Sequence, residues 1–401
     1  MKKVYIVDAR RTAIGKFLGS TASKTAAELG AAVIQDIIKR PGINPADLDE
    51  VIVGNVLSAG QGQGVARQAA IKGGVPQEVP AYGVNMICGS GMKAVLNAVM
   101  AIQSGYENLI LAGGTESMSN AGYVLPGNMR TGHRMGDGQF IDHMVNDGLT
   151  DAFSGEHMGI TAENIAEKYG ITREEQDAFS LESQRRAIAA IDAGKFKEEI
   201  VPIEYRVKKE TLVFDTDEFP NRGTNEEKVA RLRPAFKQGG PVTAANASGI
   251  NDGASFLLIA SEDAVKKHNL TPMCEIIGIG QGGVDPALMG LGPVPAIRMA
   301  LKNADLKLDQ INVIELNEAF AAQSLGVIHD LIEEHGVTRE WIDAHTNLNG
   351  GAIALGHPIG ASGNRIIVSL IYEMKHQNAE YGLASLCIGG GMGTAIVLKK
   401  V

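Results

Sequence analysis

Four side chains of this chain stand in segments where residues of their type do chemistry, and the first is a cysteine. Cys88 follows a short apolar run and precedes Gly89-Ser90-Gly91, the start of a predicted helix. A thiol at a helix N-terminus faces unpaired N–H groups and the positive end of the helix dipole, which lower its pKa. Small neighbours also let a substrate approach closely. Cys88 is therefore predicted to be a nucleophile, and a buried structural cysteine is the alternative.

A histidine far along the chain stands in a second glycine-rich segment. His357 lies between Gly356 and Gly360 and is followed directly by Pro358. A backbone constrained in this way holds an imidazole in a fixed position, as a general base requires. His357 is therefore predicted to be a general base, and a hydrogen-bonded histidine in a turn is the alternative.

Two more polar side chains each follow an apolar strand. Cys387 lies between the strand at 383–386 and the glycines at 389–391, so its thiol could move a proton while neighbouring N–H groups face a developing oxyanion. Packing in the core is the alternative for this cysteine. Asn317 follows a strand of mixed apolar character, and its amide could hold a catalytic water or cap a helix.

The elements that must position these side chains occur twice, which indicates a duplicated unit. The matching pairs are helices at 31–38 and 296–301, strand segments at 48–55 and 308–317, helices that begin at Ser90-Gly91 and Ser362-Gly363, and strands with glycines at 109–114 and 383–391. Short apolar strands alternating with helices predict layered α/β domains. His357 occupies the loop equivalent to that of Cys88, so both are expected at one crevice on the carboxyl side of the strands.

Composition limits the class of protein. The length of 401 residues predicts two or more domains, and 44% hydrophobic with 21% charged residues is typical of a globular protein. A net charge of −9 argues against a nucleic-acid or membrane-surface binder, and no apolar run is long enough to span a membrane. The three cysteines lack the spacing of a zinc site and the even number of a disulfide framework, so a reducing cytoplasm is expected.

A segment of different composition, at about 119–248, separates the two halves and is predicted to be a large insertion with helices at 160–169 and 173–193. Its basic residues stand out in an acidic chain, and a polyphosphorylated ligand could use some of them. They are Arg130, His133, Arg134, Arg222, Lys228, Arg231, Arg233 and Lys237. A solvated charged surface is the alternative for each.

Together these segments resemble the thiolase family over nearly the whole chain. The motifs are Cys88-Gly89-Ser90-Gly91, Gly113-Gly114-Thr115-Glu116-Ser117-Met118-Ser119, Asn317-Glu318-Ala319-Phe320-Ala321, Gly356-His357-Pro358-Ile359-Gly360 and Cys387-Ile388-Gly389-Gly390-Gly391-Met392-Gly393. The resemblance implies an α/β, duplicated, layered αβαβα fold with an inserted loop domain. The implied division is residues 1–118 with 249–269 as the N-terminal domain, 119–248 as the inserted domain and 270–401 as the C-terminal domain.

Within that family the chain resembles most the acetyl-CoA C-acetyltransferases. The features are the segments 147–153 and 157–159, the segment 284–290 and the triple glycine after Cys387. The implied reaction joins two acetyl-CoA into acetoacetyl-CoA and CoA, reversibly. A degradative 3-ketoacyl-CoA thiolase of broader chain length is the alternative.

The resemblance also implies a role for each candidate. Cys88 would be the acylated nucleophile, His357 the base that activates it, and Cys387 the acid or base at the α-carbon of the second acetyl-CoA. One oxyanion site would use His357 and a water held by Asn317, and the other the N–H groups of Cys88 and Gly389. Ping-pong kinetics follow from the covalent intermediate.

For CoA the resemblance points mainly to the inserted domain. The implied contacts are Leu149, His157, Met158, Phe236, Ala244, Ser248 and Gly249, with Met289 and Phe320 near the acyl and pantetheine end. An Arg that stacks on the adenine in related enzymes falls at Asn221, which leaves the neighbouring Arg222 as the candidate. Lys228 stands where a small polar residue is usual.

The implied partners are acetyl-CoA, acetoacetyl-CoA and CoA, all as substrates, with no metal or prosthetic group, no nucleic acid and no membrane. The family is generally a homotetramer built as a dimer of dimers, and residues 129–144 resemble its tetramerisation loop.

Two other classes of function remain as alternatives. Cys88, His357 and Asn317 could supply the triad of a Cys-His-Asn hydrolase, although the duplication and the second cysteine argue against it. A non-catalytic acyl-CoA binder of the same fold would not need Cys88, His357 and Cys387 together.

Overall fold

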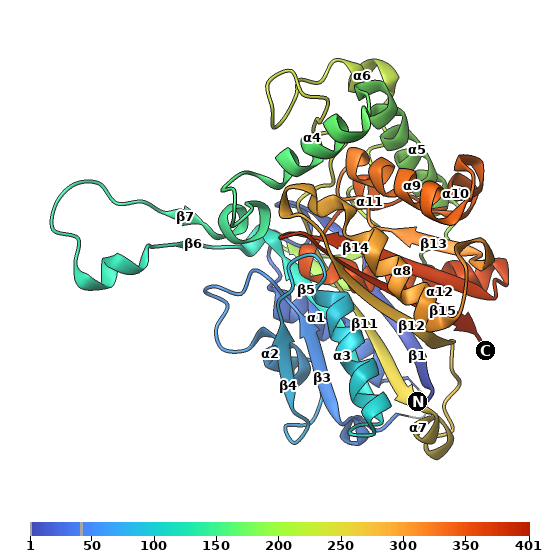
Figure 1. Ribbon diagram of the computed structural model, residues 1–401. Coiled ribbons are helices and arrows are strands. Elements are labelled where there is room, and N and C mark those ends of the chain that lie inside the picture. The colour runs from blue at the N-terminus through green and yellow to red at the C-terminus, as the bar shows by residue number, and fades with distance from the viewer. Residues whose placement is uncertain (1, 41–42) are drawn as a thin grey trace.

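The computed structural model describes residues 2–40 and 43–401, and its centre is a sheet in which the two halves of the chain repeat one topology (Figure 1). In the first half the strands lie in the order β4 (Ala81–Val84), β3 (Glu50–Gly54), β5 (Leu109–Ser117), β11 (Asn251–Ser261) and β1 (Val4–Thr12). In the second half the order is β13 (Val313–Leu316), β14 (Tyr381–Ile388), β15 (Met392–Lys400) and β12 (Cys274–Gly283).

The strand directions repeat as well as the order. The parallel pair β3–β5 corresponds to β13–β14, and each is followed by two antiparallel pairs, β5–β11–β1 in one half and β14–β15–β12 in the other. The counterpart of the edge strand β4 is reduced to a single parallel bridge between Ile314 and Thr346. The halves join where β1 pairs with β12, with Tyr5 opposite Glu275. The duplication predicted from the sequence is confirmed.

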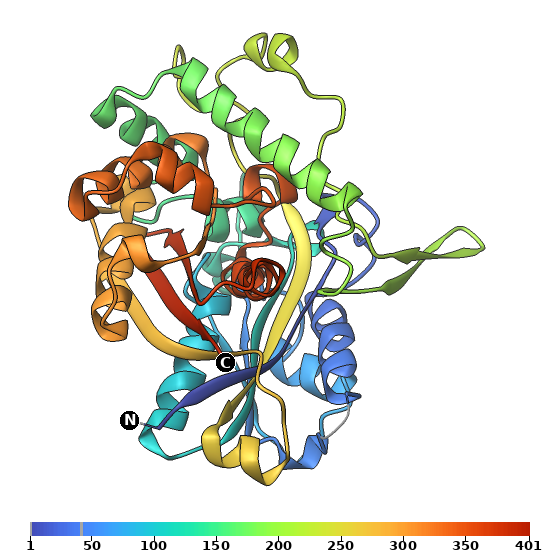
Figure 2. The same ribbon diagram turned by 90° about the vertical axis from the view of Figure 1, so that its right-hand side faces the viewer.

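Helices form three layers around the two halves of the sheet. The helices α3 (Ser90–Ser104) and α12 (Ile359–Gln377) pack together in the middle, and Figure 2 shows α12 end-on between the two halves. A Cβ on Gly363 would lie 2.7 Å from the backbone nitrogen of Met92, so the two helices approach this closely only with glycine at the crossing. On the outside, α1 (Ala26–Ile38) and α2 (Val65–Lys72) cover the first half, and α8 (Pro293–Ala304) and α9 (Ala321–His335) the second. The layers are αβαβα, as expected.

The central helices show why the sequence pattern predicted them. The apolar face of α3 is buried, with Val95, Ala98 and Ile102 fully enclosed. The predicted start of the second helix at Ser362 was wrong, because α12 begins at Ile359 directly after Pro358. Proline fixes its own backbone angle near the helical value and has no N–H to leave unpaired, so it suits the start of a helix.

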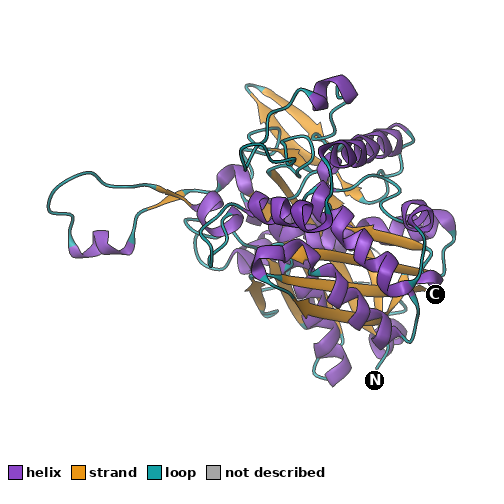
Figure 3. Cartoon of the chain, turned by 45° about the horizontal axis from the view of Figure 1, so that its top comes forward, coloured by secondary structure: helices purple, strands orange, loops and turns teal. Residues whose placement is uncertain are grey.

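The inserted segment carries an arm and a helical cap. The arm rises on the strands β6 (Tyr123–Val124) and β7 (Ile141–Asp142) and projects from the body of the molecule (Figures 1 and 3). The helices α4 (Met158–Tyr169), α5 (Arg173–Asp192) and α6 (Glu226–Ala230) lie over the second half in Figure 1. The predicted helices at 160–169 and 173–193 are therefore confirmed, α5 ending at Asp192.

The remaining elements are short, apart from one hairpin. They are β2 (Gly15–Lys16), β8 (Ile200–Val201), the hairpin β9 (Ile203–Val207) and β10 (Glu210–Phe214), α7 (Glu262–Lys267), α10 (Arg339–His345), α11 (Ala352–Leu355), and the single turns Pro45–Asp47, Met118–Asn120, Gly127–Thr131, Met144–Leu149, Pro286–Leu291 and Leu308–Gln310. No helix in the described part of the chain has the length and apolar character needed to cross a membrane.

Candidate active site

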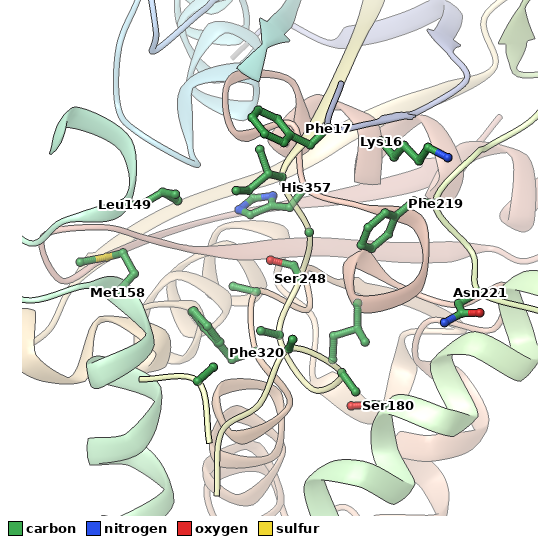
Figure 4. Close-up of a pocket in the computed structure, with 18 of the residues that line it drawn as sticks. Lys16, Phe17, Leu149, Met158, Ser180, Phe219, Asn221, Ser248, Phe320 and His357 are labelled. Carbon is green, nitrogen blue, oxygen red and sulfur yellow. The ribbon is translucent and has the colours of Figure 1, made fainter. Parts of the chain in front are cut away.

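A cavity of about 850 Å³ lies where loops of both halves meet the inserted segment (Figure 4). Most of the residues predicted for catalysis and CoA binding line it. They are Cys88, Leu149, His157, Met158, Phe236, Ala244, Ser248, Gly249, Met289, Phe320 and His357. The two loops that the repeat makes equivalent therefore do bring Cys88 and His357 to one crevice.

Cys88 projects into this cavity from a tight turn just before α3. Ile87 has a positive φ of 47°, and the Ser90 hydroxyl fixes the turn by donating to the carbonyl of Ile87 and accepting from the N–H of Met86, at 2.7 and 2.8 Å. Gly89 caps the helix, and a Cβ there would lie 2.2 Å from Ile388. The glycine thus allows the turn to pack against β14.

The predicted depression of the Cys88 pKa is wrong. Burial raises the pKa of this thiol to about 11, and the N–H groups of Gly389 and of Cys88 itself only partly oppose that rise. The negative charge of Glu116 adds to it. Because the uncharged thiol is the resting form, the nucleophile needs a base that takes its proton as it attacks.

His357 has the hydrogen bonds of such a base. Its Nδ1 lies 2.7 Å from the Oγ of Ser362, and that hydroxyl donates its proton to the carbonyl of Pro358 at 2.9 Å. The Ser362 oxygen can therefore only accept from His357, which places the imidazole proton on Nδ1. Nε2 is then the free acceptor, and within residues 2–40 and 43–401 it has no hydrogen-bond partner.

The surroundings of His357 keep it uncharged. Burial lowers the pKa of the imidazole, the positive charge of Arg365 lowers it as well, and together they bring it to about 4. The backbone N–H of His357 donates to Oδ1 of Asn251 at 2.9 Å. Gly356 adopts a φ of +105°, and a Cβ there would lie 2.5 Å from the Asn251 side chain. The loop is thus fixed by backbone contacts, and a neutral imidazole with a free Nε2 faces the cavity.

Cys387 ends the buried strand β14 and lies behind the cavity wall. It is fully buried in an apolar cluster with Met158, Met289 and Phe320, which themselves line the cavity. Burial raises its pKa above the ordinary thiol value, and negative charge on Cys88 raises it further. The resting group is a thiol that holds its proton firmly, and the thiolate formed from it would be a strong base.

The glycines after Cys387 turn the chain back into β15. Gly390 and Gly391 have φ of +84° and +82°, and a Cβ on Gly391 would lie 2.3 Å from the carbonyl of Val284. After this turn the N–H of Gly389 is close enough to the sulfur of Cys88 to lower the pKa of that thiol, as the N–H of Cys88 itself also does. The two amides predicted for an oxyanion site therefore both lie beside the reacting sulfur.

Asn317 ends β13 beside β14, and its N–H donates to the carbonyl of Ser385 at 3.0 Å. The helix-cap alternative is wrong, because α9 has Phe320 as its N-cap. The side-chain amide is buried, and neither Oδ1 nor Nδ2 has a hydrogen-bond partner among the described residues. Asn317 therefore retains both polar atoms for a group other than the protein.

Two site residues stood in segments named from the sequence, one at a predicted helix start and one in a motif, without a predicted role. Ser362 is one, and Glu116 is the other. The Glu116 carboxylate accepts four hydrogen bonds at 2.9–3.1 Å, from the Asn55 amide and from the N–H groups of Val56, Leu57 and Gly360. It thereby joins a loop of the first half to the loop of His357. A charged residue in a strand of otherwise small and apolar residues was the available signal.

Arg222 is the predicted CoA contact that the structure does not bring to the cavity. Its guanidinium donates two hydrogen bonds, at 2.6 and 3.1 Å, to Asp192 at the end of α5, and it is not among the lining residues. Asn221 lines the cavity in its place. Lys228 is not a lining residue either, and its ammonium donates a hydrogen bond to the carbonyl of Gly223.

His157 lines the cavity through its ring and also caps a helix. Its Nδ1 accepts from the N–H of Gly159 at 3.0 Å, at the start of α4, and its ring stacks on Phe236 with centroids 4.7 Å apart. Gly159 permits this stack, since a Cβ there would lie 2.2 Å from the Phe236 ring. The Phe236 ring in turn packs edge-to-face against Phe320, with centroids 6.0 Å apart.

The fold and the site define a thiolase, and the comparisons agree. Residues 4–263 match the thiolase N-terminal domain and residues 270–400 the thiolase C-terminal domain, so the chain belongs to the thiolase family. It is 53% identical to the acetyl-CoA acetyltransferase of Pseudomonas aeruginosa, over 100% of both chains.

Solved structures show the same fold. The acetyl-CoA acetyltransferase of Syntrophomonas wolfei has a TM-score of 0.96 and 44% identity, with 100% of both chains covered. Human mitochondrial 3-ketoacyl-CoA thiolase has a TM-score of 0.94 and 42% identity, with 100% of this chain and 99% of that chain covered. The family and the fold predicted from the sequence are confirmed.

Proposed function

We propose that this thiolase is an acetyl-CoA acetyltransferase, an acyltransferase that converts two acetyl-CoA into acetoacetyl-CoA and CoA and also runs in reverse. The observation that carries the proposal is the pairing in one cavity of the Cys88 thiol with a neutral His357 whose Nε2 is free. The full-length relatives named acetyl-CoA acetyltransferase support the choice of substrate.

In the first half-reaction, Nε2 of His357 takes the proton of the Cys88 thiol while the sulfur attacks the thioester carbonyl of acetyl-CoA. The N–H groups of Cys88 and Gly389 stabilise the negative charge on the carbonyl oxygen. As the tetrahedral intermediate collapses, the CoA sulfur leaves and takes the proton from His357. Acetyl-Cys88 and free CoA remain.

In the second half-reaction, His357, neutral again, takes the proton of the Cys387 thiol onto Nε2, and the thiolate then removes a proton from the α-carbon of the second acetyl-CoA. The high pKa of this thiol makes its thiolate basic enough for a weakly acidic C–H group. His357 and Asn317 stabilise the enolate oxygen, Asn317 through a water held by its free amide. The enolate carbon attacks acetyl-Cys88, the Cys88 sulfur leaves and takes the proton from His357, and acetoacetyl-CoA is released. In thiolysis, the Cys387 thiol protonates the departing enolate.

We assign CoA binding to the inserted domain, residues 119–248, between the N-terminal domain of 1–118 with 249–269 and the C-terminal domain of 270–401. The support is the lining of the cavity, to which Leu149, Phe236, Ala244 and Ser248 contribute. These residues present small and apolar surface, which suits the pantetheine chain.

The proposal includes a homotetramer formed through the arm. The arm exposes large apolar side chains, with Met135 92% and Phe140 76% exposed, which is the character of a surface that a second copy covers. The three cysteines are all free, which suits the reducing cytoplasm proposed as the location. Light scattering of the wild-type chain and of a chain shortened at residues 127–138 tests the oligomeric state.

The hydrolase alternative lacks support from the geometry. In a Cys-His-Asn triad the asparagine orients the histidine, whereas here Ser362 bonds to the Nδ1 of His357. Asn317 makes no hydrogen bond to His357 among the contacts of the described residues.

The 3-ketoacyl-CoA thiolase alternative differs only in chain length. Around Cys88 the apolar residues Val56, Leu57, Met144 and Ile359 pack closely, which favours a short acyl group. A rate series from acetoacetyl-CoA to longer 3-ketoacyl-CoAs distinguishes the two, and a maximum at acetoacetyl-CoA supports the proposal.

The decisive experiment is incubation with acetoacetyl-CoA, with and without free CoA. Consumption that requires CoA and forms two acetyl-CoA is expected. Consumption without CoA, giving free acetoacetate, would instead establish a hydrolase. Binding of acetyl-CoA without turnover in either direction would establish a non-catalytic binder.

A further inference from the structure

We propose that Lys16 binds a phosphate group of CoA, so that the N-terminal domain rather than the basic residues of the inserted segment holds the charged end of the substrate. This inference rests on the proposed function, because it concerns the CoA of that reaction. CoA carries a diphosphate and a 3′-phosphate at one end and the reacting thiol at the other. A cavity that takes it therefore needs a cation far from Cys88.

The lining of the cavity supplies one such cation. Among the lining residues that the structure describes, Lys16 is the only lysine or arginine. Figure 4 shows Lys16, Phe219 and Asn221 along one side of the cavity and Leu149 and Met158 along the other. Lys16 thus stands on the side of the inserted loop at 218–224, where a nucleotide would leave the apolar part of the cavity.

Four of the candidate cations of the inserted segment are engaged elsewhere. Arg222 forms its two hydrogen bonds with Asp192, Arg231 bonds to Glu227, and Lys237 lies 3.2 Å from Glu167. Lys228 donates to a backbone carbonyl. None of these four lines the cavity. The positions of these four residues therefore do not support the expectation that the insertion supplies the phosphate contacts.

The backbone of Lys16 is held firmly while its ammonium is not. Lys16 belongs to β2, pairs with Asn251 in β11, and donates its N–H to Oε2 of Glu218 at 3.1 Å. Its Nζ lies 3.9 Å from Oε1 of the same carboxylate, beyond hydrogen-bond distance, and its side chain is 57% exposed.

Glu218 already accepts hydrogen bonds from the hydroxyl and the N–H of Ser20, at 2.9 and 3.2 Å. The Lys16 ammonium therefore forms only a loose surface pair, which contributes little to stability. A phosphate carries more charge than this carboxylate and can take the ammonium without breaking the hydrogen bonds that fix the loop.

The test is steady-state thiolysis by the full-length enzyme, with CoA and with pantetheine, which has the same thiol but no nucleotide. In Lys16→Ala we expect the KM for CoA to rise about 3- to 10-fold with kcat within twofold, as for loss of one exposed charge contact. The KM for pantetheine should not change. Lys16→Glu should raise the KM for CoA further, and Lys16→Arg should restore it. Lys266→Ala removes a lysine of α7 whose side chain is 69% exposed, and it should behave as wild type.

Dephospho-CoA then identifies which phosphate is bound. If Lys16 meets the 3′-phosphate, Lys16→Ala will use CoA and dephospho-CoA alike; if it meets the diphosphate, the variant will lose affinity for both. An unchanged KM for CoA in Lys16→Ala and Lys16→Glu, or an equal rise for CoA and pantetheine, would overturn the proposal. A wild-type enzyme without CoA-dependent thiolysis would instead overturn the proposed function.

Discussion

Nδ1 of His357 lies 2.7 Å from the Oγ of Ser362, and the carbonyl of Pro358 takes the serine proton. His357 directly precedes Pro358, the N-cap of α12, and Ser362 lies in its first turn, so the helix start itself determines which nitrogen of the imidazole carries the proton. The consequence is a base whose free nitrogen is always Nε2. A residue four positions into the helix thus has a positioning role, although it contacts no substrate.

Ser362→Ala should reduce kcat by about 10- to 100-fold, which is part of the 10²- to 10⁴-fold that a positioned base contributes. Without the serine oxygen, Nδ1–H loses its acceptor and the imidazole is free to adopt the wrong tautomer. The KM for CoA should change little. Ser362→Thr keeps the hydroxyl and should retain more activity than alanine. Rates of Cys88 acetylation for the three proteins check this, and equal activity of the alanine variant and the wild type would contradict it.

The acid limit of the reaction should lie well below the ordinary pKa of histidine. Burial lowers the pKa of His357 to about 4, so the base remains unprotonated from neutral pH down to that value. Acetylation of Cys88 should therefore fall only as the pH falls through about 4, rather than through about 6.5. Single-turnover rates over this range, with the fold monitored by circular dichroism, test it. If the acetylation rate of the folded enzyme instead falls as the pH decreases through about 6.5, His357 is not held neutral.

The raised pKa of Cys88 predicts how this thiol reacts with an alkylating reagent. Since burial raises its pKa to about 11, the rate of alkylation by iodoacetamide should keep rising with pH above 9 instead of levelling off near 7. Mass spectrometry locates the label, and Cys88→Ser should abolish both this label and the acetyl-enzyme. Acetyl label retained on the serine variant would mean that another residue is the nucleophile.

The sequence predicted the site where local pattern and repetition were sufficient. The equivalence of two loops placed His357 beside Cys88, because a duplicated fold brings equivalent loops to one crevice. The pKa of Cys88 was not predictable in this way, since it depends on burial by β14 and by loops distant in the chain. The position of Lys16 beside the cavity was not predictable for a similar reason. Lys16 belongs to the two-residue strand β2, which lies beside the cavity only because it pairs with β11.

Glu116→Gln should destabilise the fold and slow the reaction together. Each oxygen of the Glu116 carboxylate accepts two hydrogen bonds, one of them from the N–H of Gly360 in the His357 loop. A glutamine has only one oxygen, so two buried donors would face its NH₂ group. With about 1–3 kcal/mol for each of the two unsatisfied donors, we expect the free energy of unfolding to fall by about 2–6 kcal/mol.

Urea unfolding and kcat measure the two effects of Glu116→Gln. Glu107→Gln serves as the control, because burial raises the pKa of both carboxyl groups to about 7, but Oε2 of Glu107 has no hydrogen-bond partner among the described residues. That control should leave kcat unchanged. Equal stability of Glu116→Gln and the wild type would show that the four hydrogen bonds do not hold the loop.

Cys387→Ala should separate the two half-reactions. The thiol is fully buried and lies behind Met158 and Phe320, so its loss removes a proton donor and acceptor with little change in packing. Acetylation of Cys88 depends on His357 and should remain within about tenfold of wild type, whereas condensation should fall by about 10²- to 10⁴-fold. Cys274→Ala is the matched control, because Cys274 is an equally buried free thiol in β12, away from the cavity. Mass spectrometry of the acetyl-enzyme and formation of acetoacetyl-CoA measure the two steps. An equal loss in both would mean that Cys387 supports the nucleophile instead of exchanging the α-proton.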